Sequence, residues 1–305
     1  MDILCVGLTV CDVLAKPVRP DALTVDSSRL DSLALRPGGD AMNVACNLAR
    51  QGVRVALVGR VGNDGFGAFL REELASAGVT DLLVTDEDSA TSTSLVLLEE
   101  NGERHFLYYG RSNDRLNPAD VDPALLKKAR HLHIGSAMAL AGLDGAGLAK
   151  LFALARENGV TTSLDCTNDN QNVWYDKIAE ALPLVDYFLP SYEEAAAVAG
   201  TPELREIEAF FRDKGVKTLA VKLGNKGSIV TDFSQRYEIA IYPDEGVVDT
   251  TGAGDAYVSG FLHGVLDGAP MDECARRGSF LAAHVVSVVG AHVPPGCSLR
   301  EKFGK

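Results

Sequence analysis

The stretch "AMNVACNLARQGVRVALVGRV", residues 41–61, decides the fold class because it contains a helix, a turn and a strand in immediate succession. Its first half has the spacing of an amphipathic helix, and Gly52 is placed to end that helix. The short apolar run that follows, residues 54–61, predicts a buried strand. A helix leading directly into a buried strand is half of a βαβ unit.

The same alternation continues on both sides of this stretch. Upstream, "ILCVGLTV" at residues 3–10 predicts the first strand. Downstream, strand-like and helix-like runs follow one another as "FGAFLREELASAG" (66–78), "HLHIGS" (131–136), "GLAKLFALARENG" (147–159), "VTTSLD" (160–165), "VDYFLP" (185–190), "SYEEAAAVAG" (191–200) and "TLAVKLG" (218–224). The pattern predicts an α/β fold, with a doubly wound, mostly parallel sheet flanked by helices. In such a sheet, ligands bind at the carboxyl ends of the strands.

Two segments interrupt the alternation. Residues 12–36 are polar and contain proline, and residues 91–110 are two strand-like runs around Asn101-Gly102, a type I′ hairpin signal. We interpret both segments together as a small β lid on an α/β domain of residues 1–11, 37–90 and 111–305. Two unrelated surface excursions fit the pattern equally well.

Composition excludes several classes of protein. A net charge of −13 argues against binding to nucleic acids or anionic membranes, which requires a basic surface. The six cysteines show no CxxC or zinc spacing, and no apolar run is long enough to span a bilayer. The start of the chain does not resemble a signal peptide, so we expect a cytoplasmic protein with reduced thiols.

A second glycine-rich stretch, "DTTGAGDAYVSG" at residues 249–260, precedes apolar positions at helical spacing. Residues 252–255 therefore lie at a helix start, where free amides and the positive end of the dipole suit a phosphoryl group. A simpler interpretation is that Asp255 only complements the helix dipole. The sequence lacks the P-loop, protein-kinase and dinucleotide-binding patterns, so any phosphate site is of another kind.

Two long stretches, "PGGDAMNVACNLARQGVRVALVGRVGNDGFG" (37–67) and "DTTGAGDAYVSG", resemble the signatures of the ribokinase-like (PfkB-type) carbohydrate kinases, and the resemblance extends over essentially the whole chain. It implies ATP-dependent phosphorylation of a hydroxyl, usually the primary alcohol of a sugar or nucleoside, with Mg²⁺. By this resemblance Asp255 is the general base, and the amides of Gly252, Ala253 and Gly254 form an anion hole. A carboxylate beside the transferred group can accept the acceptor's proton as its oxygen attacks.

The resemblance also implies an acceptor site formed by Asp12, Gly38, Gly39 and Asn43. Carboxylate and amide groups suit paired hydroxyls, although Asp12 could be a strand-end turn residue and Asn43 an exposed helix position. Arg111, in "YYGRSND", could bind a carboxylate or hydroxyl of the acceptor, but a solvated arginine is the simpler interpretation.

For ATP, "VKLGNKGSIV" (221–230) resembles the strand and turn that line the nucleotide, and implicates Lys222, Gly224, Asn225 and Gly227. A tight hairpin explains the same residues. Where the family commonly has Asn-x-x-Glu, this chain has Ser191 and Glu194. Glu194 is expected in the Mg²⁺ network, Ser191 is a weaker candidate for the nucleotide site, and the pair also matches a capping box.

Further expectations come only from the resemblance. Many relatives hold a monovalent cation, which would be K⁺ bound here by Asp249, Thr251 and carbonyls near Gly290. The lid sheet often pairs between subunits, so a homodimer is expected.

Three functions remain open. The leading hypothesis is a sugar kinase whose lid closes over the acceptor and excludes water. A nucleoside kinase is the alternative, with Phe106, Tyr108 and Tyr109 available to stack on a base. A catalytically silent sugar- or nucleotide-binding regulator is the third, although the intact Gly-Ala-Gly loop and Asp255 argue against it.

Overall fold

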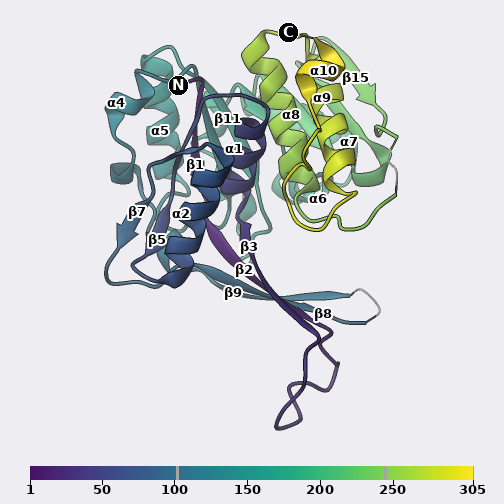
Figure 1. Cartoon of the computed structure of the whole chain (residues 1–305). Helices are drawn as coiled ribbons and strands as arrows, with labels where there is room; N and C mark the ends of the chain where they lie inside the picture. Colours follow the sequence, from purple (N-terminus) through teal and green to yellow (C-terminus); the bar gives the residue numbers. More distant parts are fainter. Residues whose placement is uncertain (101–102, 244–245, 305) are drawn as a thin grey trace.

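A computed structural model describes residues 1–100, 103–243 and 246–304 of the chain. Within these residues the large sheet has nine strands, in the order β15-β14-β13-β12-β11-β10-β1-β4-β6 (Figure 1). Seven strands run parallel, and β14 and β15 join one edge antiparallel. The strands are β1 (Ile3–Gly7), β4 (Val55–Val58), β6 (Thr80–Asp81), β10 (His131–Ala137), β11 (Thr161–Cys166), β12 (Tyr187–Phe188), β13 (Thr218–Lys222), β14 (Ser228–Thr231) and β15 (Arg236–Ile239).

Helices cover both faces of this sheet, as the alternation predicts. One core lies between the sheet and α5 (Ala146–Glu157), α6 (Tyr192–Ala199) and α7 (Leu204–Asp213). The other lies beneath α1 (Asp40–Arg50), α2 (Gly65–Ala77), α8 (Ala253–Asp267) and α9 (Met271–Val285). Leu4 and Val6 of β1 enter the first core and Ile3 and Cys5 the second, because successive strand residues point to opposite faces.

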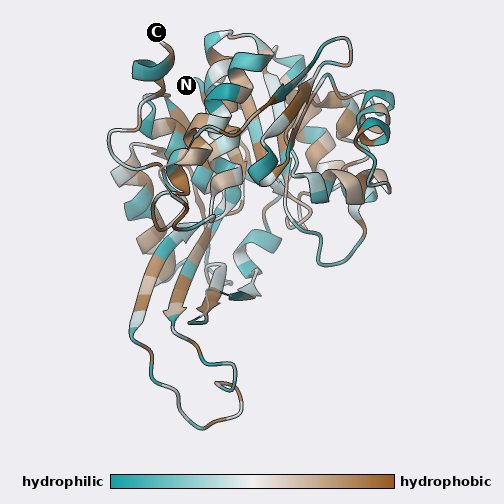
Figure 2. Ribbon diagram, turned by 90° about the vertical axis from the view of Figure 1, so that its right-hand side faces the viewer, coloured by the Kyte–Doolittle hydropathy of each residue, from teal (hydrophilic) through white to brown (hydrophobic). Residues whose placement is uncertain are grey.

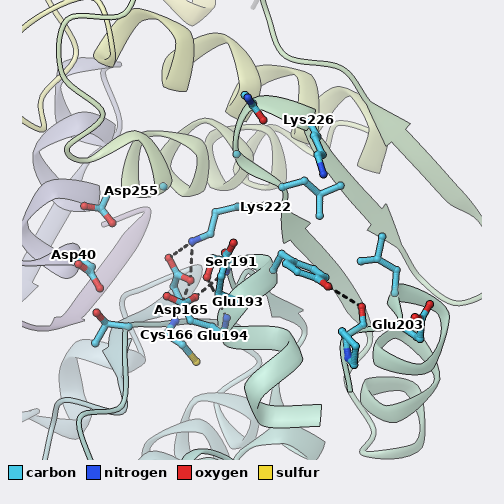
Figure 3. Close-up of a pocket in the computed structure, with 18 of the residues that line it drawn as sticks. Asp40, Asp165, Cys166, Ser191, Glu193, Glu194, Glu203, Lys222, Lys226 and Asp255 are labelled. Carbon is cyan, nitrogen blue, oxygen red and sulfur yellow. Dashed lines mark hydrogen bonds and ion pairs between the residues drawn. The ribbon is translucent and has the colours of Figure 1, made fainter. Parts of the chain in front are cut away.

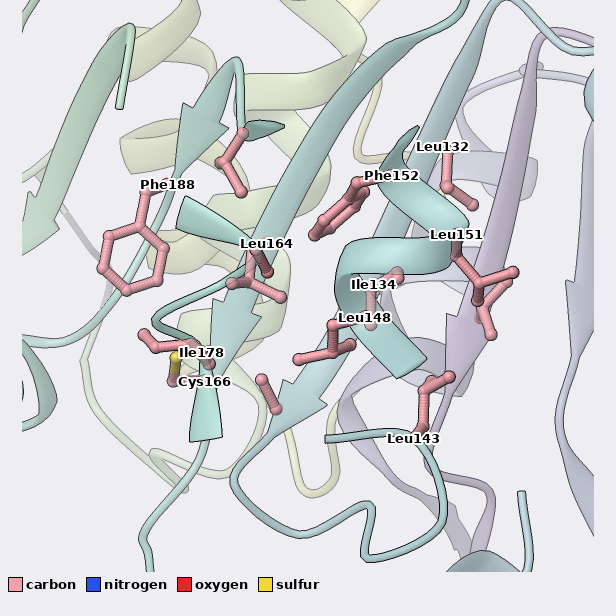
Figure 4. Close-up of a cluster of buried hydrophobic side chains, with 14 of the residues drawn as sticks. Leu132, Ile134, Leu143, Leu148, Leu151, Phe152, Leu164, Cys166, Ile178 and Phe188 are labelled. Carbon is pink, nitrogen blue, oxygen red and sulfur yellow. The ribbon is translucent and has the colours of Figure 1, made fainter. Parts of the chain in front are cut away.

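The first core is packed tightly around the middle of the sheet. Phe152 and Leu148 of α5 lie against Ile134 of β10 and Leu164 of β11, all fully buried (Figure 4). Burying such side chains is the main stabilising contribution to the fold. This rigid sheet fixes the strand ends from which the site is built.

A separate four-stranded sheet projects from this body, in the order β3-β2-β8-β9. Its strands are β2 (Val10–Lys16), β3 (Ser32–Gly38), β8 (Thr93–Leu98) and β9 (Arg104–Tyr109). The two interrupting segments therefore meet in one sheet, with β2 parallel to β8. Strands β8 and β9 pair antiparallel as the hairpin signal predicts, and the turn itself, Asn101-Gly102, lies outside the described residues. Figure 2 shows this sheet and the 17–31 loop extending away from the main body.

The expectation of a single strand over residues 3–10 is wrong. β1 ends at Gly7, and Val10 already belongs to the small sheet. The Asn113 side chain bonds both backbone groups of Thr9 at this break, at 3.2 and 3.0 Å, and so replaces the ladder partners that a continuous strand would have had. Asp12 consequently lies within β2 rather than at the end of the first strand.

The remaining elements are short. A two-stranded sheet joins β5 (Arg60–Gly62) to β7 (Val84–Asp86). The short helices are α3 (Arg111–Asp114), α4 (Pro123–Leu126) and α10 (Leu299–Phe303), with 3₁₀ turns η1 (Pro118–Asp120), η2 (Trp174–Lys177), η3 (Leu182–Leu184) and η4 (Gly224–Lys226). In the described part of the chain, each helix is too short or too polar to span a bilayer.

Candidate active site

A cavity of about 890 Å³ opens at the carboxyl ends of the central strands. Asp165 at the end of β11, Ser191 just after β12 and Lys222 at the end of β13 line it from the sheet. Asp40 and Asp255 line it from the starts of α1 and α8. Figure 3 shows their side chains converging on one space, where an α/β sheet is expected to bind ligands.

The glycine-rich loop begins α8 as the sequence predicts, with Ala253 as its first residue. Gly252 has a positive φ of 72°, and a Cβ there would lie 2.3 Å from the Cβ of Ala291. At Gly254 a Cβ would instead face the cavity, with the ammonium of Lys222 as its nearest neighbour at 3.6 Å. The start of α8 is therefore open to an anion, which would lie between the amides of the first turn and the ammonium of Lys222.

Asp255 and Asn43 are in direct contact behind this loop. The side-chain amide of Asn43 donates to Asp255 Oδ2 at 2.7 Å, and both residues are buried. Burial, reinforced by the charge of Asp40, raises the pKa of Asp255 well above its usual range. The Oδ1 atom of Asn43 is buried without a hydrogen-bond partner among the described residues, which leaves a strong acceptor free for a ligand.

Asp12 faces this region from the small sheet. Its carboxylate fills the space above Gly38, where an added Cβ would lie 2.3 Å from Asp12 Oδ2. Burial and the charge of Asp40 raise the pKa of Asp12 to about 7. Gly39 has a structural role of its own, since its φ is 91° and a Cβ would lie 2.5 Å from the carbonyl oxygen of Leu8.

A buried ion pair forms the floor of the cavity. The ammonium of Lys222 donates to both carboxylate oxygens of Asp165, at 2.9 and 2.7 Å. Although burial opposes it, the charges of Asp165 and Glu194 raise the pKa of Lys222, so the lysine stays protonated. Burial raises the pKa of Asp165, and the charge of Lys222 opposes that shift.

Ser191 and Glu194 form the capping box that the sequence predicts. The Ser191 amide donates to Glu194 Oε2 at 2.7 Å, and the Glu194 amide donates to Ser191 Oγ at 3.3 Å. Both residues also line the cavity. With Asp165, Glu194 supplies the carboxylate oxygens that Mg²⁺ prefers, so the donor set fits this ion.

The turn after β13 separates the main cavity from a smaller, largely apolar one of about 270 Å³. Gly224 and Asn225 line both cavities. Gly227 is required by packing, because a Cβ would lie 2.0 Å from the carbonyl oxygen of Ile239. β13 and β14 pair antiparallel here, so the hairpin interpretation and the cavity-lining one hold together.

Asp249 and Thr251 lie together, and the cation that they bind is an arginine. Thr251 donates to Asp249 Oδ1 from its hydroxyl at 2.7 Å. Arg104 Nη1 donates to the same Asp249 oxygen at 3.0 Å and to Thr251 Oγ1 at 2.6 Å. The Gly290 amide donates to the other Asp249 oxygen at 3.1 Å.

Arg111 stands apart from these groups. It is exposed at the start of α3, and its guanidinium lies over the ring of Tyr109 with 5.7 Å to the centroid. It does not line either cavity described above.

Sequence reasoning missed several residues of the site, among them Asp40, Asp165 and Arg104. Asp165 ends the predicted strand 160–165, so the rule that ligands bind at strand ends pointed to it. Asp40 follows Gly38 and Gly39 directly and accepts a hydrogen bond from Ser136 at 2.6 Å. Arg104 carried no local signal, because its partners lie about 145 residues away.

The architecture and the position of the cavity define a ribokinase-like protein. The structure of a putative ribokinase II from Escherichia coli in complex with ATP and Mg²⁺ superposes with a TM-score of 0.80, at 23% identity over 95% of this chain and 94% of that one. The chain belongs to the pfkB family of carbohydrate kinases, which matches residues 1–295, and it is a carbohydrate kinase.

Curated relatives agree with this assignment. A 2-dehydro-3-deoxygluconokinase of Bacillus subtilis (strain 168) is 30% identical over 277 residues, covering 87% of this chain and 84% of its own. A fructokinase of Escherichia coli is 33% identical over 250 residues, covering 79% of this chain and 81% of its own. Both span most of the present chain.

Proposed function

We propose that this carbohydrate kinase transfers the γ-phosphoryl group of ATP to a hydroxyl of a small sugar or sugar acid, with Asp255 as the general base. The contact between Asn43 and Asp255 carries the proposal. It places a carboxylate and an unpaired amide oxygen side by side next to the open start of α8. A hydroxyl bound there has its proton within reach of Asp255 and its oxygen facing the anion site.

Asp255 would accept the proton as the acceptor oxygen attacks. Its raised pKa makes it a better proton acceptor once it is ionised, and the hydrogen bond from Asn43 holds the carboxylate in orientation. The amides at Gly252, Ala253 and Gly254 would stabilise the charge on the transferred group, together with the ammonium of Lys222.

The nucleotide would extend across both cavities. The apolar cavity, lined by Ile241, Val247, Tyr257 and Ala283, suits an adenine, while Gly224 and Asn225 lie between it and the phosphate region. Asp165 and Glu194, with Ser191 fixing the Glu194 carboxylate, would hold Mg²⁺. The bound ion would neutralise phosphate charge.

Asp12 and Asn43 would hold the acceptor from two sides, with Gly38 leaving room for the Asp12 carboxylate. Because Asp12 belongs to the small sheet and Asn43 to α1, acceptor binding would draw the sheet onto the main body as a lid. The names of the relatives favour a ketose or a keto sugar acid. Arg111, at the start of α3 and outside both cavities, would contribute only to an acceptor that extends as far as this helix.

A nucleoside is the second candidate acceptor. Phe106 and Tyr108 alternate along β9 on the face of the sheet that carries Asp12, and their side chains are 61% and 43% exposed. Such rings could stack on a base. Tyr109 points to the opposite face, so it would not take part.

The deciding experiment measures ADP release from Mg²⁺-ATP with a panel of ketoses, sugar acids, aldoses and nucleosides. Saturable turnover of one class, lost in Asp255→Asn, supports the proposal and names the acceptor. Binding of a sugar or nucleotide in a thermal-shift assay with no ADP from any acceptor would make the chain a silent regulator.

We also propose a homodimer formed through the outer face of the small sheet. Leu33, Leu35, Leu95 and Leu107 share that face by register and are 38–66% exposed. An apolar patch of this kind marks an interaction surface. Sedimentation of the wild type against Leu95→Asp tests it: the variant should be a monomer, and a monomeric wild type would contradict the proposal.

A reducing cytoplasm is the location we propose. All six cysteines lie within described residues and are free thiols. Unpaired cysteines are typical of proteins kept in reducing compartments. Fractionation of the native host, with the protein followed by antibody, would test this.

A further inference from the structure

Arg104 and Asp12 lie on the same face of the small sheet. Asp12 is opposite Ser94, Ser94 is opposite Tyr108, and Arg104 is four residues before Tyr108 on β9. Residues separated by an even number on a strand share a face. One face of this sheet therefore contacts the acceptor region at one end and, through Arg104, the loop that precedes α8 at the other.

The contact made by Arg104 is extensive. Its guanidinium donates to Asp249 Oδ1 at 3.0 Å, to Thr251 Oγ1 at 2.6 Å and to Thr250 Oγ1 at 3.0 Å. These three residues immediately precede the Gly-Ala-Gly turn, and Thr250 also lines the small apolar cavity. A single side chain thus connects the sheet that carries Asp12 to the loop that would hold the phosphoryl group.

This arrangement does not fit the monovalent cation that the resemblance implies. A K⁺ ion bound through the side chains of Asp249 and Thr251 would compete with Arg104 for Asp249 Oδ1 and Thr251 Oγ1 and would meet its positive charge. The second Asp249 oxygen accepts the Gly290 amide at 3.1 Å, so it too is engaged. An arginine is permanently charged and presents a fork of donors matched to such oxygens, so it can replace a bound cation.

We propose that Arg104 takes the place of the monovalent cation, so that turnover does not depend on K⁺, and that its contact ties the small sheet to the phosphate-binding loop. This inference rests on the proposed phosphotransfer. Arg104 is a positioning residue: it touches neither substrate, and it acts by neutralising Asp249 beside the anion site. Without it, the Asp249 carboxylate would oppose phosphate binding, and the loop would lose three hydrogen bonds.

The test compares the wild type with Arg104→Met and Arg104→Lys in KCl, NaCl and tetramethylammonium chloride at equal ionic strength. The wild type should give the same kcat and the same KM for ATP in all three salts. Arg104→Met should lose about tenfold in kcat/KM for ATP without K⁺, the loss expected for charged hydrogen bonds, and regain most of it in KCl. Arg104→Lys should fall between them, because it keeps the charge but not the fork.

Arg19→Met is the matched control, since Arg19 is an exposed arginine of the 17–31 loop whose guanidinium, among the residues that the structure describes, pairs with Asp21 two positions on. It should behave as the wild type in every salt. A second readout needs no turnover: KCl should raise the melting temperature of Arg104→Met more than NaCl does, and should have no such specific effect on the wild type.

Three results would overturn the inference: a wild type that requires K⁺, an Arg104→Met variant as active as the wild type, or a loss in that variant that K⁺ does not repair. The wild-type salt series decides the first even if a variant fails to fold. Failure of the proposed phosphotransfer can be told apart from failure of this inference. In that case no ADP would form in any of the three salts, while the K⁺-specific stabilisation of Arg104→Met would still be measurable.

Discussion

The side-chain amide of Asn43 donates to the carboxylate of Asp255 at 2.7 Å, although the two residues are 212 positions apart in the chain. The contact joins the first turn of α1 to the first turn of α8. It leaves the single side-chain oxygen of Asn43 buried and without a hydrogen-bond partner among the described residues. The helices thus present a carboxylate and a hydrogen-bond acceptor to the same small volume.

Replacing Asp255 with Asn should abolish turnover without loss of the fold. General base catalysis is worth about a hundredfold to ten-thousandfold, so we expect a fall in kcat of that order. Because burial raises the pKa of Asp255, a neutral amide is tolerated at this position, and the melting temperature should not fall. Asp213→Asn, at an exposed carboxylate, is the control. A kcat within a factor of a few of the wild type would remove Asp255 from the mechanism.

Asn43→Ala should weaken acceptor binding. The substitution removes the free oxygen and the donor to Asp255, and each hydrogen bond to a charged group is worth about 1.5–3 kcal/mol. We expect KM for the acceptor to rise about tenfold or more while KM for ATP changes little. Initial rates with either substrate varied separate the two constants, and an unchanged acceptor KM would place the sugar elsewhere.

The pKa of Asp12, raised to about 7, predicts two opposite responses to pH. Between about pH 4 and pH 7 the Asp12 carboxyl is protonated in the folded state but ionised in the unfolded chain. The free energy of unfolding should therefore fall as the pH rises through this range, by up to about 4 kcal/mol from this group. The ionised form is the better hydrogen-bond acceptor, so KM for the acceptor should fall as pH rises through 7.

Asp12→Asn separates these effects from those of other groups. It should flatten both profiles and be more stable than the wild type at pH 8. Urea unfolding and acceptor titrations at several pH values provide the measurements. Parallel profiles for the variant and the wild type would show that another group titrates.

The Lys222–Asp165 pair should behave as a buried ion pair. Lys222→Met leaves the Asp165 carboxylate buried and unpaired, which costs about 3–5 kcal/mol of unfolding free energy. Adding Asp165→Asn should recover much of that loss, since no lone charge remains. Both variants should bind ATP poorly, because the ammonium that faces Gly254 is gone. Additive losses in the double variant would mean that the two groups do not interact.

Substitutions at Ser191 test the effect of having serine where the family commonly has asparagine. Ser191→Ala removes the acceptor for the Glu194 amide and should cost about 1 kcal/mol, whereas Ser191→Asn keeps an acceptor and should cost little. If Ser191 also serves the nucleotide, KM for ATP should rise in the alanine variant only. Equal melting temperatures for all three proteins would show that the cap is not stabilising.

Much of this fold could be predicted from the sequence because its signals are local. Gly52, Gly78 and Gly200 mark real helix ends, and the strand ends follow from apolar runs. The break at Thr9 could not be found, because "ILCVGLTV" is apolar throughout and the interruption depends on Asn113, 104 residues away. The length and hydrophobic pattern of a segment carry no information about a hydrogen-bond partner so far away in the sequence.

The residues of the candidate site could likewise be predicted only where they lie in local motifs. Asp255 and Asn43 lie in motifs, so the resemblance points to both. The pairing of Lys222 with Asp165 and the contact of Arg104 with Asp249 depend on tertiary structure, and an isolated lysine or arginine usually indicates only a solvated surface. Gly39 and Gly227 were expected among the acceptor-site and ATP-site residues, yet backbone packing alone explains why they are glycines.

The charge balance of the main cavity has a consequence for the form in which its ligand arrives. Six carboxylates line it, against the three cations Lys222, Lys226 and Arg205. A free polyphosphate entering this space is repelled by those carboxylates that are ionised, whereas the same molecule chelated to a divalent ion carries less negative charge. If the nucleotide binds in this cavity as proposed, its complex with a divalent metal ion would therefore be favoured over the free nucleotide.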